Sequence, residues 1–318
     1  MADPSVDHPA ARGGAASDCI VVTAADARYF VYAQELIRSI RASSSVSIAI
    51  GFLDLGVQED QRDWLRAQGV ALGQPQSGLR LKDHEEVSGK FGYLARPFLR
   101  ESFPGYATYI WLDADTWLQD ASALTMLQAA AEADGAAVVR QNERAYRFWP
   151  WLIGWQLKHF VLGYGVLNGL RLAACPHINN GVFAMRATAP HWELWQRRYQ
   201  SALDRTGNPA PHDQFGLNAA VYLDRPRTTF LPATCNWIAD LATPMWDEET
   251  ERFCKPYPPH ETIGLLHLAG PAKTAEVEVR TTRGRSLRTR LRYGANVPAV
   301  AETAPALPSA PVRNPVRI

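Results

Sequence analysis

Short apolar runs alternate with helix-length segments along the first half of the chain. The apolar runs predict strands at residues 19–23, 46–53, 70–72, 109–112 and 135–139. Helices are predicted between them at 30–42, 58–68, 89–101 and 121–133. Pro97 lies inside the third helix, where it would kink or break the backbone. This alternation predicts an α/β fold with a Rossmann-like, mostly parallel sheet that helices cover on both faces.

The second half of the chain is less regular. Residues 148–162 are strongly apolar and rich in Trp, with Pro150 placed as it would be at a helix N-terminus. We favour a buried or lid helix here over a wall for an apolar acceptor or an interfacial membrane contact. Further helices are predicted at 190–203 and from His212 onward, and a strand runs into a glycine-containing loop at 263–273.

The C-terminal region changes in composition. Residues 276–295 form a basic extension in which Leu287 and Leu291 alternate with arginines, so a solvated hairpin is favoured over a basic face towards anionic lipid. Residues 296–318 are rich in Pro and Ala, and residues 1–17 in Ala, Gly, Asp and Pro, so both ends are predicted to be disordered. Residues 18–275 are therefore predicted to form a single domain, large enough to be a catalytic domain.

Overall composition narrows the classes of function. The chain has 33 Lys and Arg against 32 Asp and Glu, a balance that argues against a nucleic-acid partner. The four cysteines are far apart and form no Cys-x-x-Cys pair, so we expect reduced, packed thiols in a cytoplasmic protein. No apolar stretch has the length of a secretory signal or a membrane span, which leaves peripheral membrane contact open.

The most informative stretch is the apolar run 109–112 followed by Asp113-Ala-Asp115. The two carboxylates fall where a buried strand reaches its C-terminal end, the edge at which open α/β sheets bind ligands. Carboxylates one residue apart can converge on one divalent cation, which could neutralise a departing diphosphate. A polar turn after a strand is the simpler alternative, since Asp-x-Asp alone is unspecific.

Other polar motifs follow in a fixed order and make the sequence resemble glycosyltransferase family 8. This family comprises retaining, nucleotide-sugar-dependent enzymes of the GT-A fold, among them bacterial lipopolysaccharide galactosyl- and glucosyltransferases and glycogenin. The resemblance covers about residues 19–273. It rests on Ala24-Ala-Asp26, Arg96 seventeen residues before Asp113, Asp113-Ala-Asp115, Asn180-Gly181, Asp213-Gln214, Leu231-Pro232 with Asn236, and His267-Leu-Ala-Gly270-Pro-Ala-Lys273.

The resemblance implies a role for each motif. It implies that Asp113, Asp115 and His267 bind Mn²⁺ or Mg²⁺. It implies donor and substrate contacts from Ala24, Asp26, Tyr29, Arg96, Asn180, Gly181, Gly270 and Lys273. The residues that it places at the reacting sugar and leaving group are Gln214, Asp213 and Lys273. Two departures, Phe215 after the Asp-Gln pair and Thr274-Ala275 after the lysine, bear on which sugar and acceptor are used.

The implied activity is transfer of a hexose from a UDP-sugar to a hydroxyl acceptor, with retention at the anomeric carbon. Because Gln214 is neither a useful base nor a good nucleophile, a same-face displacement is favoured over a covalent intermediate on Asp213. The alternatives are a non-catalytic nucleotide-sugar-binding module and a sugar-phosphate nucleotidyltransferase.

Simpler structural roles stay open for the individual residues. Asp26 and Asp213 could cap helices, and Asn180-Gly181 could be only a turn. His267 could be a core histidine and Arg96 a surface charge.

Overall fold

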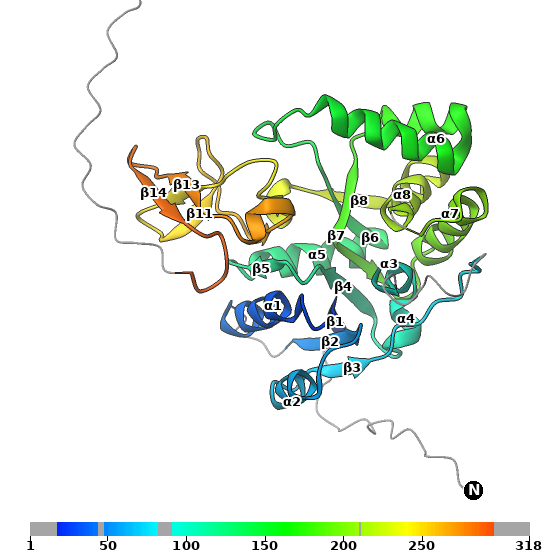
Figure 1. Cartoon of the computed structure of the whole chain (residues 1–318), viewed down its shortest axis with the longest axis horizontal. Helices are drawn as coiled ribbons and strands as arrows, with labels where there is room; N and C mark the ends of the chain where they lie inside the picture. The colour runs from blue at the N-terminus through cyan, green and yellow to red at the C-terminus, as the bar shows by residue number, and fades with distance from the viewer. Residues whose placement is uncertain (1–17, 44–47, 82–90, 210, 296–318) are drawn as a thin grey trace, which may run out of the picture.

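A computed structural model of the protein describes residues 18–43, 48–81, 91–209 and 211–295, so the predicted disorder of 1–17 and 296–318 lies outside the described residues. Its centre is a seven-stranded sheet (Figure 1). The strands are β1 (Cys19–Ala25), β2 (Ala49–Asp54), β3 (Ala71–Gly73), β4 (Thr108–Leu112), β6 (Ala136–Arg140), β7 (Ile178–Arg186) and β8 (Thr228–Leu231). They lie in the order β3-β2-β1-β4-β7-β6-β8. Only β7 runs antiparallel to its neighbours in this sheet, which confirms the mostly parallel α/β fold.

Helices cover both faces of this sheet. One face packs on α1 (Phe30–Ser43), α2 (Glu59–Ala67) and α5 (Ser122–Asp134), and the opposite face on α7 (His191–Thr206) and α8 (His212–Ala219). Consecutive side chains of β4 point to opposite faces, so Ile110 enters one core cluster and Trp111 the other. Because both faces are covered, β1 and β4 are continuous apolar runs rather than alternating ones.

The predicted helix at 89–101 is broken at Pro97, as expected from the missing N–H of proline. The backbone forms α3 (Phe91–Ala95), a 3₁₀ turn (Arg96–Phe98) and α4 (Leu99–Ser102). Arg96 is the first residue of the 3₁₀ turn, directly before the proline. The break therefore falls at the residue whose side chain reaches the polar edge of the sheet.

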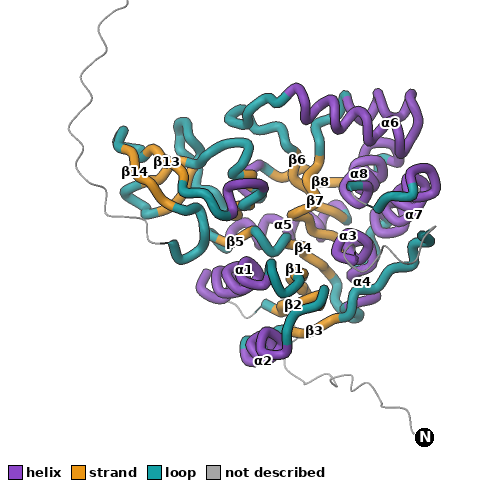
Figure 2. The backbone as a smooth tube through the Cα atoms, viewed as in Figure 1, coloured by secondary structure: helices purple, strands orange, loops and turns teal. Residues whose placement is uncertain are grey.

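A second, smaller layer lies beside the main sheet. It consists of β5 (Thr116–Leu118), β12 (Leu265–His267) and β9 (Trp237–Ile238), with two hairpins, β10 (Met245–Asp247) with β11 (Arg252–Cys254) and β13 (Val277–Arg280) with β14 (Ser286–Thr289). Figure 2 shows that loops make up much of this part. The predicted C-terminal hairpin is confirmed, and Leu287 on β14 and Leu291 just after it are buried against the core of this layer.

Helix α6 (Pro150–Ala173) begins at the predicted proline but runs beyond residue 162, with a non-helical residue at Gly165. Its inner face packs on α7 and α8 through Phe160, Tyr164 and Leu172. Of the favoured interpretation as a buried or lid helix, burial is wrong for the outer face, where side chains such as Trp151 are exposed. Among the described residues, no helix combines the length and apolar character needed to cross a bilayer.

Candidate functional site

The two aspartates lie on a tight turn between β4 and β5. The backbone N–H of Asp113 donates to the carbonyl of Gly181 on β7 at 2.8 Å, which continues the ladder between β4 and β7. The Asp113 carbonyl then accepts hydrogen bonds from the N–H and the hydroxyl of Thr116, at 2.9 and 2.8 Å. The chain therefore leaves the main sheet at Asp113 and enters the small sheet at Thr116, with Asp115 in the turn.

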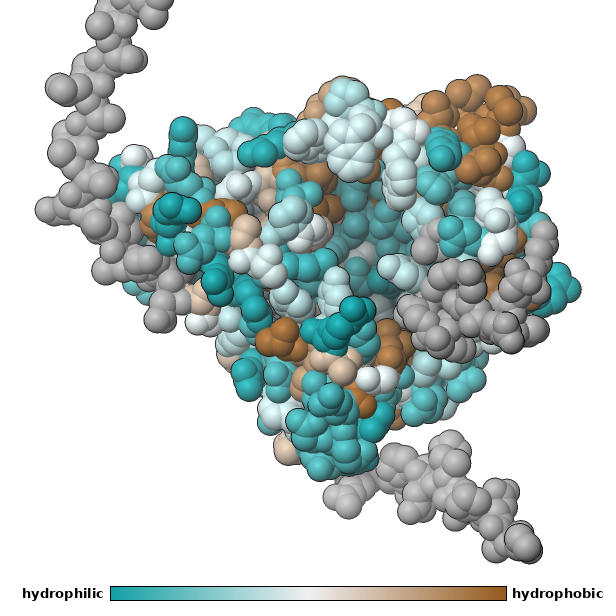
Figure 3. Space-filling view, viewed as in Figure 1, coloured by the Kyte–Doolittle hydropathy of each residue, from teal (hydrophilic) through white to brown (hydrophobic). Residues whose placement is uncertain are grey.

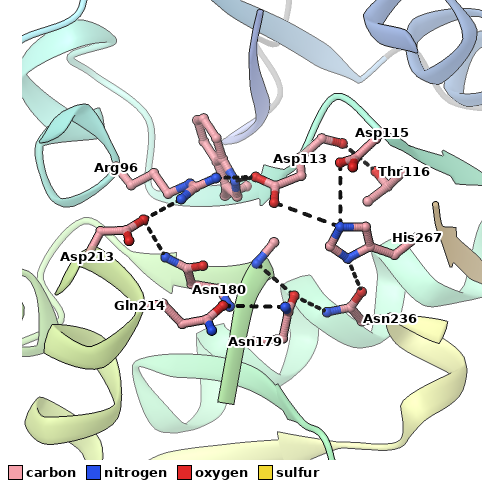
Figure 4. A network of polar contacts seen from close by, with 12 residues as sticks. Arg96, Asp113, Asp115, Thr116, Asn179, Asn180, Asp213, Gln214, Asn236 and His267 are labelled. Carbon is pink, nitrogen blue, oxygen red and sulfur yellow. Dashed lines mark hydrogen bonds and ion pairs between the residues drawn. The ribbon is translucent and has the colours of Figure 1, made fainter. Parts of the chain in front are cut away.

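His267 reaches these carboxylates from another strand. It pairs with Thr116 across β5 and β12, and its Nε2 lies 3.4 Å from Asp115 Oδ1 and 3.9 Å from Asp113 Oδ2 (Figure 4). One ligand atom from each of the three residues lies within 4.8 Å of the others. The structure thus brings together the three residues that the family resemblance assigned to a metal.

The chemistry of this cluster fits a divalent cation. His267 Nδ1 is 3.0 Å from Asn236 Oδ1, so Nδ1–H donates to the amide oxygen and the ring is held with Nε2 towards the carboxylates, as in many metal-binding histidines. Burial raises the pKa of Asp115, but the charges of His267 and Lys273 outweigh it and leave that pKa well below its ordinary value. Burial lowers the pKa of His267, but the Asp115 carboxylate raises it overall. Both directions follow from the negative charge of the clustered carboxylates, which also favours a cation.

Arg96 links the cluster of Asp113, Asp115 and His267 to helix α8. Its guanidinium lies 2.6 Å from Asp113 Oδ1, forms an ion pair with Asp213, and stands over the Trp111 ring at 5.1 Å from the centroid. Its side chain is only 12% exposed, so the surface-charge alternative is wrong. The N-cap of α8 is Pro211, so Asp213 does not cap that helix. Instead its carboxylate accepts from Arg96 and, at 2.9 Å, from Asn180 Nδ2.

Gln214 is held by three polar partners beside Asp213. Its Oε1 accepts from the backbone N–H of Asn180 at 3.2 Å and from Asn179 Nδ2 at 3.4 Å. Its Nε2 donates to Nε2 of His177 at 2.7 Å. Because a backbone N–H can only donate, the bond from the Asn180 N–H identifies the Gln214 atom that it contacts as the oxygen. Asn180 is thus more than a turn residue.

Amide side chains complete the network between Gln214 and His267 (Figure 4). Asn236 Nδ2 donates to Asn179 Oδ1 at 3.0 Å, and the same oxygen accepts from the Gly181 N–H at 3.0 Å. Sequence reasoning gave no role to Asn179 or His177 and named Asn236 only as part of a motif. The adjacency of Asn179 to Asn180-Gly181 was the one sequence signal that could have found it.

Gly181 lies where no side chain fits. A Cβ at this position would approach His267 Cε1 at 2.5 Å and Asp113 Oδ2 at 2.7 Å. Gly270, with a φ of +60°, opens the 3₁₀ turn that ends at Lys273. Both glycines therefore shape the backbone around the cluster, and neither offers a side chain to a ligand.

A pocket of about 270 Å³ opens beside the cluster. Its walls include Ala24, Asp26, Tyr29, Leu55, Gly92, Tyr93, Arg96, Asp113 and Asp115. The face drawn in Figure 3 is hollowed near its centre. Lys273 Nζ lies 2.9 Å from Asp115 Oδ2 and 5.4 Å from the centroid of the Tyr29 ring, and both of these residues line the pocket.

Asp26 combines two possible roles. Its Oδ1 accepts hydrogen bonds from the N–H groups of Arg28 and Tyr29, at 3.0 and 2.8 Å, in the turn that leads into α1. Because both N–H groups precede α1, which begins at Phe30, Asp26 closes the turn before the helix and does not cap the helix itself. The same side chain lines the pocket, and Leu55, Gly92 and Tyr93 are further pocket residues that the sequence did not indicate.

The fold is that of nucleotide-sugar glycosyltransferases, the GT-A fold. The chain is similar to the crystal structure of the galactosyltransferase LgtC in complex with donor and acceptor sugar analogs, at 16% identity over 80% of this chain and 88% of that chain, with a TM-score of 0.52. An active-site mutant of LgtC is similar at 15% identity over 79% of this chain and 88% of that chain, with a TM-score of 0.51.

Sequence comparisons add nothing to this likeness. The chain matches no model of a known protein family. No curated protein matches its sequence either. The identities to the solved structures are low, so the likeness establishes the fold, and the chemistry of the site has to be argued from its own residues.

Proposed function

We propose that this protein is a metal-dependent glycosyltransferase that moves a hexose from a UDP-sugar to a hydroxyl acceptor with retention of configuration. The observation that carries this proposal is the convergence of Asp113, Asp115 and His267 within 4.8 Å beside a pocket at the carboxyl edge of β4. The shared fold supports it, since LgtC was solved with donor and acceptor sugar analogs.

The three clustered residues would hold Mn²⁺ or Mg²⁺, whose charge, when bound, stabilises a leaving diphosphate. Lys273, beside the pocket residue Asp115, offers a second positive charge to the same leaving group. Asp26 and Tyr29, which line the pocket, would contact the nucleobase, and Ala24 would leave room for it. Arg96 lines the pocket and would contact donor phosphate or sugar while orienting Asp113.

The residues around Gln214 support retention by a same-face displacement. Gln214 is a weak nucleophile and no base, so its carbonyl can stabilise an electron-poor anomeric carbon without forming a lasting bond. Asp213 is the only competent carboxylate beside it in the described network, but its charge is engaged by Arg96 and Asn180. A covalent intermediate on Asp213 is therefore the less favoured route, and the leaving phosphate would accept the acceptor proton.

The test is to incubate the protein with UDP-glucose or UDP-galactose, Mn²⁺ or Mg²⁺, and simple glycoside acceptors. We expect UDP release that depends on the cation, and a product whose anomeric proton signal keeps the α configuration of the donor. A β-linked product would overturn retention. Pyrophosphate release from UTP and hexose 1-phosphate would instead identify a nucleotidyltransferase. Binding of UDP-sugar with neither transfer nor hydrolysis would identify a non-catalytic module.

A further inference from the structure

Helix α6 carries most of the large apolar side chains that the described residues expose. Nine of thirteen such side chains lie between Phe148 and Leu170. They are Phe148, Trp149, Trp151, Ile153, Trp155, Leu162, Val166, Leu167 and Leu170. Figure 3 shows brown side chains gathered where Figure 1 draws this helix. A contiguous exposed patch of this kind marks an interaction surface.

The inner face of α6 packs against α7 and α8, so the helix is anchored to the domain while its outer side chains stay exposed. Phe160, Tyr164 and Leu172 are buried in one core cluster with Phe215 of α8. Arg205 of α7 donates to the carbonyl of Leu162 at 3.0 Å. The helix is thus apolar on both sides, one packed on protein and the other open, and a helix that is apolar all round requires a second apolar environment.

The charged residues within the segment that carries this patch have one sign. Between residues 144 and 192 the sequence contains no Asp or Glu, while Arg147, Lys158 and Arg171 are exposed along the helix and its approach. Lys158 and Arg171 have no carboxylate partner within the described part of the chain. The nearest acidic residue before the helix, Glu143, is turned inward onto Lys255 and its side chain is only 8% exposed. The patch therefore presents apolar and cationic groups together.

The tryptophans point to the kind of surface that this patch contacts. Trp149, Trp151 and Trp155 lie at the N-terminal end of α6, where their rings are partly exposed. Trp rings are enriched at the headgroup level of membranes, and Lys and Arg beside them are attracted by anionic lipid. A protein partner would have to offer an acidic, apolar surface of the same shape, whereas an anionic bilayer supplies both properties without one.

We propose that the outer face of α6 docks on an anionic lipid bilayer, with its apolar side chains in the headgroup boundary and Arg147, Lys158 and Arg171 against lipid phosphates. This inference does not depend on the proposed glycosyl transfer, because it rests on exposed residues that are not part of the proposed metal site. Trp155 packs on Phe215 at 5.4 Å between ring centroids, and Phe215 follows Gln214, so the docked face would lie next to the proposed sugar site.

Co-flotation of the full-length protein with vesicles tests the proposal. We expect binding to vesicles of equal phosphatidylglycerol and phosphatidylcholine, and little binding to phosphatidylcholine alone. Trp151→Gln with Leu167→Gln should lower the vesicle partition coefficient at least about tenfold, the scale of removing large apolar side chains from an apolar phase. The matched control is Val31→Gln with Met126→Gln, two partly exposed apolar residues on α1 and α5, which should leave partitioning unchanged.

A second variant isolates the charges. Lys158→Gln with Arg171→Gln should weaken binding to the anionic vesicles by about fivefold for each charge removed, and high salt should have the same effect on the unaltered protein. Circular dichroism and thermal unfolding would establish that both α6 variants are folded. If they are not, quenching of tryptophan fluorescence in the unaltered protein by brominated lipid tests the same contact.

Three results would overturn the docking proposal. The first is absence of binding to the anionic vesicles. The second is equal binding by the unaltered protein and the Trp151→Gln, Leu167→Gln variant. The third is a dimer in solution that this variant abolishes without any vesicle binding, which would assign the face to a second copy of the chain.

Discussion

The Nε2 of Gln214 donates a hydrogen bond to the Nε2 of His177 over 2.7 Å, and this bond holds the amide whose carbonyl we place at the anomeric carbon. His177 is buried, and burial lowers its pKa to about 3, so the ring is neutral and its Nε2 can accept. In the proposed mechanism His177 would therefore be a positioning residue that acts through Gln214.

Removing this acceptor should affect turnover more than donor binding. We expect His177→Phe to lower kcat about tenfold or more with little change in the KM for the UDP-sugar, because Gln214 loses the partner that fixes its amide. His177→Gln, whose side-chain oxygen can replace Nε2 as acceptor, should restore most of the rate. Steady-state kinetics of both variants measure this, and equal losses in the two would show that His177 only fills space.

Removing one carboxylate of the cluster should weaken binding of the cation itself. Asp115→Asn keeps the size of the side chain and removes its charge, so we expect Mn²⁺ affinity to fall at least about tenfold. Isothermal calorimetry with Mn²⁺ alone measures this without relying on activity. Asp63→Asn, at a side chain that is 69% exposed on α2, is the matched control and should bind Mn²⁺ as the unaltered protein does. Unchanged affinity in Asp115→Asn would refute the site.

Lys273 should matter for the leaving group. Its ammonium is 2.9 Å from Oδ2 of Asp115, which lines the pocket where the diphosphate is proposed to lie. We expect Lys273→Ala to lower kcat by about 10²-fold, the scale of losing one preorganised donor, and Lys273→Arg to lose less because the charge remains. A change confined to the KM for the acceptor would place Lys273 outside the donor site.

Buried histidines should make the fold sensitive to acid. Burial lowers the pKa of His177 to about 3, and those of His191 and His212 to about 4, from an ordinary 6.5. Above about pH 6.5 these rings are neutral in both states and add no pH dependence. Below it the unfolded chain binds protons that the folded chain excludes, so stability falls as pH drops towards about 4.

The loss should reach at most about 1.4 kcal/mol per pH unit for each histidine. Denaturant unfolding at about pH 7, pH 6 and pH 5 measures this slope. His191→Gln, which can keep the contact with the Thr228 hydroxyl, should remove one histidine's share of the slope. A slope identical to that of the unaltered protein would mean that His191 is not protonated on unfolding.

Most strands and helices of the first half could be predicted from the sequence, because the local pattern of apolar and polar residues determines them. The strands and helices of the first half are close to their predicted positions, and Pro97 breaks its helix for a local reason, the missing N–H. The small sheet was not predicted, since β5 is only three residues long and pairs with β12, which is nearly 150 residues further on. Such pairing depends on chain topology that no local pattern records.

The same limit applies to the site. The motifs behind the family resemblance identified Asp113, Asp115 and His267, but they did not identify the polar partners that orient these side chains. His177 and Asn179 act through contacts with Gln214, about 35 residues away, so their roles exist only in the folded chain. The helix at 148–162 was predicted, whereas its exposure was not, because an apolar sequence does not say which side is covered.

Gly181 offers the sharpest test of how closely the cluster is packed. An added methyl group would meet His267 Cε1 at 2.5 Å and Asp113 Oδ2 at 2.7 Å, so Gly181→Ala should push two of the three proposed ligands apart. We expect the loss to appear chiefly in Mn²⁺ affinity, by about tenfold or more, since the overpacking is local and should cost only about 1–3 kcal/mol of stability.

Gly154→Ala is the matched control, because a Cβ there meets nothing within 4 Å and lies on the exposed side of α6. That change should leave Mn²⁺ binding unaltered and raise stability by about 0.5–1 kcal/mol through helix propensity. Mn²⁺ affinity that is the same in both variants would mean that Asp113 and His267 do not share an ion.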